Sequence, residues 1–308
     1  MQNQPTRLLV MGMPRSGTTL LANLLNSQPG FTVYSDFLAS PFMNARQFGG
    51  FKKSLSDKEK MASLARMKWD LRTLHFNIDR NVESFQTIDD IYWEAIRIIG
   101  NDGDRFVGNK ICMSNAVLPL VLSETDVRCI YIIRDPRDAA LSWSNWNLVD
   151  ALSYVHDWLD AIHLVHTIPP NPNLVIVKYE DLVLDPERAI RPIESLIGQL
   201  IETNLGELSN HAAPWIENSA FHDVTRVLDS RPVGRWRRSL EDPSVRYASW
   251  RCKKEIEMLG YAPCPSDLLT SQEIVSFYRS DLAFRAVRLG GQLKRTLTNR
   301  FIRFVSGR

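Results

Sequence analysis

Residues 8–25 have the sequence Leu8-Leu-Val-Met-Gly-Met-Pro-Arg-Ser-Gly-Thr-Thr-Leu-Leu-Ala-Asn-Leu-Leu25. The apolar run at its start predicts a buried strand, and the leucines at helical spacing after the glycine-containing turn predict a helix. The first turn of a helix leaves backbone N–H groups unpaired, and the helix dipole favours negative charge there. Arg15, Ser16, Thr18 and Thr19 add side-chain donors at the same place. We therefore expect this stretch to bind a phosphate-like group.

The turn differs from that of a nucleotide-triphosphatase. Gly12 and Gly17 have the G-x-x-x-x-G spacing, but the lysine that should follow is Thr18, and the cation is Arg15 inside the loop. A second apolar run, residues 129–133, is followed by Arg134 rather than by a metal-holding aspartate. Arginine at a strand end suits an anion bound without a metal. The two stretches together predict a nucleotide with phosphates at two separate places.

The composition narrows the class of protein. The chain has 308 residues, 44% of them hydrophobic, which is enough for one large α/β domain or two small ones. A net charge of +2 gives no overall signal for nucleic-acid binding. The four cysteines form no C-x-x-C pair and no signal peptide is visible, so we expect reduced thiols and a cytoplasmic protein. The histidines of residues 151–167 suit an amphipathic helix face, and we expect no metal site.

Strands that alternate with helices predict a parallel, doubly wound sheet. In such sheets ligands bind at the carboxyl ends of the strands. Asp36 follows one predicted strand and Lys110 lies near the end of another, so both are candidate site residues. An aspartate in an ordinary turn and a lysine on the surface would give the same sequence pattern. The run 174–182 reads as a further buried strand. Residues 40–105 read as a helical insertion that forms a cap over the site.

Two basic segments follow. The first is Asp229-Ser-Arg-Pro-Val-Gly-Arg-Trp-Arg-Arg238, which could fold over a nucleotide with Gly234 as a hinge. Its arginines would then contact phosphate, and Trp236 would lie on the base or pack beneath it. A solvated basic turn is the alternative interpretation of the whole segment. From Arg279 onward the tail has eight basic residues against Asp281. Leucines at helical spacing predict a basic amphipathic helix, broken at Gly290-Gly291. Packing on the domain, homodimerisation and peripheral contact with an anionic membrane all stay open for it.

Five motifs in chain order resemble the sulfotransferases that use 3′-phosphoadenosine 5′-phosphosulfate (PAPS). The resemblance spans residues 7–262 and rests on Pro14-Arg-Ser-Gly-Thr-Thr19, Ile133-Arg-Asp-Pro-Arg-Asp138 with Ser142, Tyr179-Glu-Asp-Leu182 with Asp185-Pro186, Val233-Gly-Arg-Trp-Arg237 and Leu259-Gly-Tyr261. It implies an α/β, P-loop-like three-layer fold with a central parallel sheet, helices on both faces and a helical cap insertion. The expected domain is 1–264, with the cap at 40–105 and the tail at 265–308.

The resemblance also implies roles for individual residues. Cytosolic sulfotransferases have a loop lysine, and a histidine two residues after the lysine of the third strand. Here the loop cation is Arg15. Cys112 lies two residues after Lys110, at the position of that histidine and of the proline in the usual K-x-P. The chain looks closer to the tyrosylprotein-sulfotransferase and bacterial branch. That branch implies Asp36 as the general base, with Lys110 and Arg15 stabilising the transferring group; His75 and His222 are alternative bases by residue type alone. The implied nucleotide-binding set is Pro14, Arg15, Ser16, Gly17, Thr18, Thr19, Arg134, Ser142, Ser219 or Ser230, Arg231, Gly234, Arg235 and Trp236.

The activity implied by the resemblance is in-line transfer of a sulfuryl group from PAPS to an acceptor hydroxyl. The product nucleotide would be adenosine 3′,5′-bisphosphate (PAP), no metal is expected, and nucleic acid is not an expected partner. A small molecule, a lipid or glycan, and a peptide all stay open as acceptor. One alternative is a P-loop-type kinase, which a magnesium requirement would favour. The other is a nucleotide-binding, membrane-associated adaptor that uses the basic tail.

Overall fold

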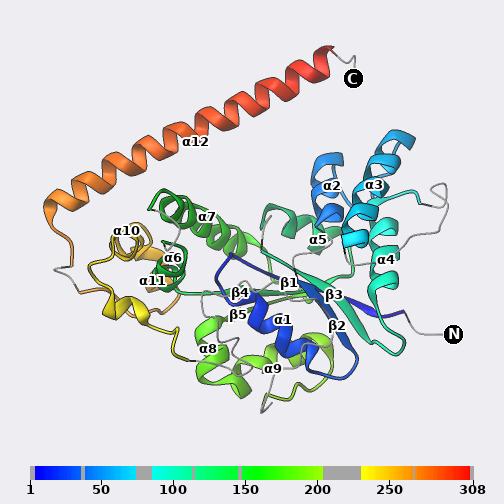
Figure 1. Cartoon of the computed structure of the whole chain (residues 1–308), viewed down its shortest axis with the longest axis horizontal. Coiled ribbons are helices and arrows are strands. Elements are labelled where there is room, and N and C mark those ends of the chain that lie inside the picture. The colour runs from blue at the N-terminus through cyan, green and yellow to red at the C-terminus, as the bar shows by residue number, and fades with distance from the viewer. Residues whose placement is uncertain are drawn as a thin grey trace.

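The central sheet has five parallel strands in the order β2-β3-β1-β4-β5 (Figure 1). The computed structural model describes residues 4–35, 39–73, 85–112, 115–144, 148–203, 230–265 and 268–305. The strands are β1 (Thr6–Gly12), β2 (Phe31–Ser35), β3 (Phe106–Ile111), β4 (Arg128–Ile133) and β5 (Leu174–Lys178). Because β1 is the middle strand, the loop that follows it lies where the strand order reverses, which is where open α/β sheets bind ligands.

Helices cover both faces of this sheet, and β1 shows why. Successive side chains of a strand point to opposite faces. Leu8 and Val10 belong to a core formed with α1 (Thr18–Asn26), α8 (Tyr179–Leu184) and α9 (Pro186–Ile197), whereas Leu9 and Met11 belong to the core on the other face. All four side chains are buried. The predicted three-layer α/β fold with a parallel sheet is therefore confirmed.

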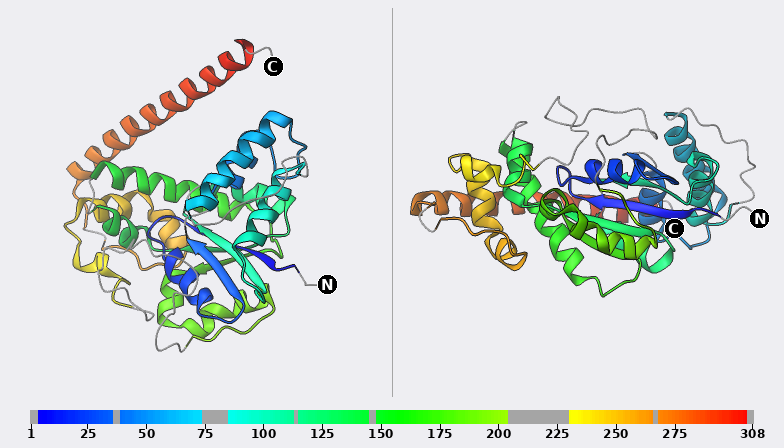
Figure 2. Two further views of the ribbon diagram at one scale, coloured as in Figure 1. Left: turned by 45° about the vertical axis from the view of Figure 1, so that its right-hand side comes forward. Right: turned by 90° about the horizontal axis from the view of Figure 1, so that it is seen from below.

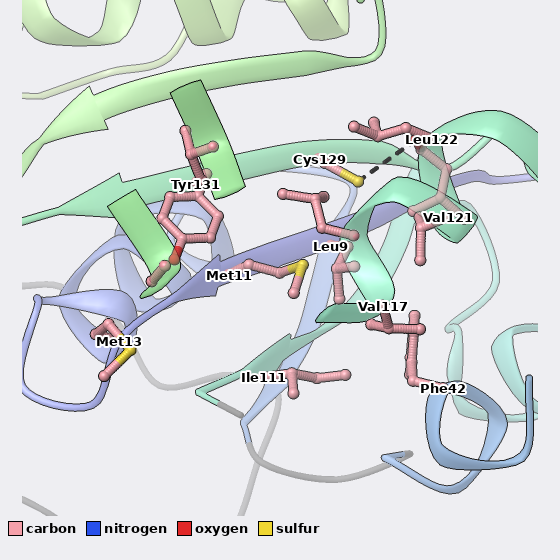
Figure 3. Packing of buried hydrophobic residues seen from close by; sticks show 14 of the residues in the cluster. Leu9, Met11, Met13, Phe42, Ile111, Val117, Val121, Leu122, Cys129 and Tyr131 are labelled. Atoms are coloured by element: carbon pink, nitrogen blue, oxygen red, sulfur yellow. Dashed lines mark hydrogen bonds between the residues drawn. The ribbon is translucent and has the colours of Figure 1, made fainter. Parts of the chain in front are cut away.

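The second core joins the sheet to the remaining helices of the domain (Figure 3). Leu9 and Met11 lie there with Phe42, Val117 and Val121. Its helices are α2 (Ser40–Phe48), α3 (Asp57–Thr73), α4 (Ile88–Ile99), α5 (Leu118–Glu124), α6 (Pro136–Ser144), α7 (Leu148–Thr167), α10 (Pro243–Arg251) and α11 (Lys253–Met258). Three of these, α2, α3 and α4, come from the segment expected to form a cap. They share the main core, and a covering role toward the site stays a prediction.

Two predicted elements have different boundaries in the structure. The run 174–182 is not one strand, because β5 ends at Lys178 and α8 begins at Tyr179. β5 is also an edge strand, and 43% of Ile176 is exposed, so the prediction of a buried strand is wrong. The sequence also predicts a single helix from Val245 to Leu259, whereas the structure has two helices, α10 and α11, that meet at Cys252.

The C-terminal segment forms one continuous helix, α12 (Ser271–Val305). The predicted break at Gly290-Gly291 is wrong, since glycine lowers helix stability by only about 1 kcal/mol per residue relative to alanine. The views in Figures 1 and 2 agree that the first turns of α12 lie beside the domain and that the rest projects away from it. Among the helices of the described segments, none is long and apolar enough to cross a membrane.

Candidate functional site

The loop between β1 and α1 turns sharply at two residues. Arg15 has φ 67° and Gly17 has φ 97°, both in the left-handed region. Between them, the backbone N–H and the side-chain Oγ of Ser16 both donate to the Met13 carbonyl, at 3.1 and 2.6 Å. Helix α1 then begins at Thr18, and its N-cap residue, Gly17, has no side chain that could bond the first N–H groups. The loop and the helix N-terminus therefore form a concave group of backbone donors that suits an anion.

Replacing Gly17 by alanine is expected to lower both thermal stability and nucleotide affinity. A Cβ at this position would lie 2.3 Å from Cδ2 of Tyr179, and the positive φ adds strain. We expect a cost of roughly 1–3 kcal/mol or more from the strained backbone together with the displaced ring. Gly103→Ala is the matched control, because φ is 93° there and a Cβ would meet nothing within 4 Å. Equal melting temperatures for the two variants would contradict the role assigned to this contact.

Arg134 follows β4 and joins the loop to the late basic segment. It is 6% exposed and donates from its two terminal nitrogens to the carbonyls of Arg15 and Pro232, each at 2.9 Å. Its guanidinium lies 4.3 Å from the centre of the Tyr179 ring. The Nε of Arg134 is buried and has no hydrogen-bond partner among the residues that the structure describes. An arginine held this firmly still retains a buried donor for an anion.

The side chain of Arg15 connects the two predicted phosphate sites. Its Nε donates to Oγ of Ser142 at 2.9 Å, on helix α6 (Pro136–Ser144). Ser142 is 4% exposed. Burial, followed by the positive charges of Arg134 and Arg235, lowers the pKa of Arg15. Arginine stays charged at neutral pH, so three guanidinium groups concentrate positive charge beside the loop.

Lys110 brings a fourth cation to the same edge of the sheet. Only 1% of its surface is exposed, and it pairs in register with Val10 of β1 and with Ser35, the last residue of β2. Its Nζ lies 3.6 Å from Sγ of Cys112, which in turn lies 3.0 Å from Oγ1 of Thr18. Cys112 therefore links the lysine to the loop, a contact that the sequence did not predict. The only sign of it in the sequence was that Cys112 occupies the position at which cytosolic sulfotransferases have a histidine.

Asp138 holds the late basic segment against the site. Its carboxylate accepts hydrogen bonds from the backbone N–H groups of Gly234 and Trp236, at 2.6 and 2.8 Å. Burial raises the pKa of Asp138, and these two hydrogen bonds oppose that rise. Trp236, in the 3₁₀ turn η3 (Arg235–Arg238), is 3% exposed and packs with Leu141 and Val245. Of the two interpretations of this ring, the structure favours packing beneath the segment. Sequence reasoning missed the role of Asp138.

A second layer of contacts supports Arg134. The Asp135 N–H donates to Oε1 of Glu180 at 2.9 Å, and the Tyr261 hydroxyl donates to Oε2 at 3.1 Å. Burial raises the pKa of Glu180 to about 7. Asp135 also forms a bidentate ion pair with the fully buried Arg137. The contacts of Glu180 join three of the sequence motifs, residues 133–138, 179–182 and 259–261.

The structure brings together most, but not all, of the predicted site. The contacts above join the loop 14–19, Lys110, Arg134, Ser142 and the backbone of Gly234 and Trp236 into one cluster. Ser230 and Arg231 are exposed. Asp36, His75, Ser219 and His222 lie outside the described residues. Within the described part of the chain, no three His, Cys, Asp or Glu side chains are grouped as metal ligands.

Comparisons with known proteins give a consistent result. The model of the sulfotransferase family matches residues 7–200. The sulfotransferase domain of the curacin biosynthetic pathway superposes with a TM-score of 0.55 at 16% identity, over 84% of this chain and 99% of that one. The sulfotransferase domain of the Synechococcus PCC 7002 olefin synthase gives 0.50 at 19% identity, over 76% and 88%. Retinol dehydratase, solved with retinol and PAP, gives 0.42 at 16% identity, over 83% and 82%. The sequence matches no curated protein significantly.

Proposed function

The chain belongs to the sulfotransferase family, and on that premise we propose that it transfers a sulfuryl group from PAPS to an acceptor hydroxyl. The observation that carries the proposal is the convergence of Arg15, Lys110 and Arg134 on one glycine-containing loop at a helix N-terminus. Such a set suits a ligand with several anionic groups. It fits a nucleotide whose two phosphate positions lie close to each other across this loop.

The donor set fits PAPS on three counts. The loop backbone of residues 14–19 and the first turn of α1 would hold the 5′-phosphosulfate. Arg134 and Ser142 would hold the 3′-phosphate, for which the unpartnered Nε of Arg134 supplies a buried donor. The segment 230–236, fastened by Asp138, would close over the nucleotide through its arginines. Bound PAPS would supply an activated sulfuryl group attached to a phosphate leaving group.

The chain has candidate residues for stabilising the charge that develops during transfer and for accepting the proton of the acceptor hydroxyl. Arg15 and Lys110 would stabilise the negative charge that builds on the equatorial and leaving oxygens during transfer. Because Lys110 is almost fully buried, its ammonium acts in a low dielectric, where such stabilisation is strong. The acceptor hydroxyl must lose a proton, and a positioned base contributes roughly 10²- to 10⁴-fold to such a step.

Asp36 is our candidate for that base. It follows Ser35, which pairs in register with Lys110 at the carboxyl end of the sheet. We expect Asp36→Asn to lower turnover by roughly 10²-fold or more while PAP affinity stays intact, since only the proton acceptor is lost. Initial rates and calorimetric titrations with PAP check this prediction. Near-normal turnover would assign the base to another residue.

The activity itself is tested by mass spectrometry. The protein is incubated with PAPS and a panel of phenols, sterols, sugars and tyrosine peptides, in buffer with and without a magnesium chelator. We expect one or more acceptors to gain a single sulfuryl group, with an equal amount of PAP released. Transfer of a phosphoryl group from magnesium ATP, with none from PAPS, would contradict the proposal and support a kinase.

A further inference from the structure

One face of the long helix α12 is bound to the domain through a buried polar cluster. Asp281 is 7% exposed and accepts hydrogen bonds from the Tyr247 hydroxyl at 2.8 Å and from Arg251 Nε at 3.1 Å. Nε2 of His156 lies 2.8 Å from the same carboxylate, and the His156 ring stacks on Phe284 with centroids 4.7 Å apart. These contacts fix the first turns of α12 to α7 and α10.

A second, apolar face of α12 is largely exposed, although Tyr278 at its start packs edge-on against Trp250 of α10, with ring centroids 4.8 Å apart. Val275, Tyr278 and Leu282 follow one another at helical spacing and are 49%, 58% and 70% exposed. The sequence continues this spacing with Ala286, Leu289, Leu293 and Leu297. At about 100° per residue, these positions centre on the side of the helix nearly opposite to that of Phe277, Asp281 and Phe284. Beyond the contact of Tyr278 with Trp250, the apolar stripe therefore lies on the side of α12 away from the buried polar cluster.

The positive charge of the helix limits which kinds of partner could bind to this stripe. Between Arg279 and Arg308 the sequence has eight basic residues and one acidic residue, Asp281. Since Asp281 is buried and ion-paired within the chain, the projecting part of the helix offers no carboxylate to a partner. Two copies packed stripe to stripe would bring like charges together, whereas helix pairs are normally stabilised by opposite charges beside the seam. An anionic surface is the complementary partner.

We propose that the apolar stripe of α12 binds an anionic lipid surface, with basic residues on the two sides of the stripe, such as Lys294 and Arg303, adding electrostatic attraction. A helix with an apolar stripe and an arginine-rich polar face lies in the membrane interface rather than across it. The 35 residues of α12 give a length of about 50 Å, most of it beyond the domain (Figures 1 and 2). The contacts of Asp281 and Phe284 then hold the catalytic domain at the lipid surface. This inference does not rest on the proposed sulfuryl transfer.

Vesicle flotation with the full chain tests the proposal. Vesicles of phosphatidylcholine with phosphatidylglycerol should carry the protein with them, and pure phosphatidylcholine vesicles should not. Leu289→Gln/Leu293→Gln and Lys294→Gln/Arg303→Gln should each weaken binding roughly 10-fold or more. Raising the salt concentration should weaken it as well.

The matched control is Ser280→Gln/Thr298→Gln. These two positions are 18 residues apart, five helical turns, and fall on the side of α12 between its two stripes. The control should bind vesicles like the unmodified protein, and circular dichroism should show equal helix content in all variants. Equal binding by the leucine variant, or a concentration-dependent dimer that this variant abolishes without any vesicle binding, would overturn the proposal. Sulfation of a soluble acceptor needs no vesicles, so failure here is distinguishable from failure of the proposed activity.

Discussion

Lys110→Met is expected to lower turnover roughly 10²- to 10³-fold while leaving the affinity for PAP almost unchanged. Methionine keeps an unbranched side chain in a site that is 1% exposed, but it removes the charge. The ammonium is assigned to the charge that develops during transfer, so its loss should affect the rate far more than the binding of the product nucleotide. Steady-state rates with a saturating acceptor and calorimetric titration with PAP separate the two effects.

Lys178→Met is the matched control for this experiment. Lys178 is also a strand-end lysine, on β5, and it bonds to the Leu259 carbonyl and lies 5.1 Å from the centre of the Tyr261 ring. Its replacement should cost some thermal stability and leave the turnover of the folded protein intact. If Lys110→Met and Lys178→Met reduce turnover equally, the lysine on β3 has a structural role and not an electrostatic one.

Arg134→Ala is expected to weaken PAP binding roughly 10- to 100-fold, because charge-assisted hydrogen bonds to a phosphate are lost. Its tethers to the carbonyls of Arg15 and Pro232 are lost as well. Adenosine 5′-monophosphate separates these two effects. If Arg134 binds the 3′-phosphate, the affinity for this ligand, which lacks that group, should change much less than the affinity for PAP. Isothermal titration with both nucleotides gives the comparison.

The control for Arg134 lies at the other end of the same strand. Arg128 is the first residue of β4 and bonds to the Leu196 carbonyl on α9. Arg128→Ala should lower thermal stability without changing the ratio of the two nucleotide affinities. An equal loss for both nucleotides in Arg134→Ala would mean that this arginine supports the loop and does not contact the 3′-phosphate.

Some features of the site could be predicted from sequence because the residues that form each of them are neighbours in the chain. The strand, loop and helix of residues 8–25 are encoded by apolar spacing and by Gly17. The ends of β3 and β4, with Lys110 and Arg134, follow from apolar runs that stop at a charge. In a parallel sheet, these ends share one edge, so their convergence with the loop was predictable as well.

Contacts between distant segments could not be predicted in the same way. Arg15 and Ser142 are 127 residues apart, and Asp138 holds backbone groups 96 and 98 residues further along the chain. These contacts depend on where α6 lies relative to the β1–α1 loop and to η3, which residue spacing does not specify. The contacts from Lys110 through Cys112 to Thr18 could be predicted only if the register between β1 and β3 were known. Helix α12 was misjudged at Gly290-Gly291 because a small local penalty was read as a break.

Titration of the unmodified protein with PAP and with adenosine 5′-monophosphate, in buffer that contains a magnesium chelator, tests the central claim most directly. It needs no knowledge of the acceptor. The assignment of two phosphate sites around Arg15 and Arg134 predicts that PAP binds without magnesium. It also predicts that removing the 3′-phosphate weakens binding at least roughly 10-fold. Equal affinity for the two nucleotides, or binding of magnesium ATP with none of PAP, would contradict it.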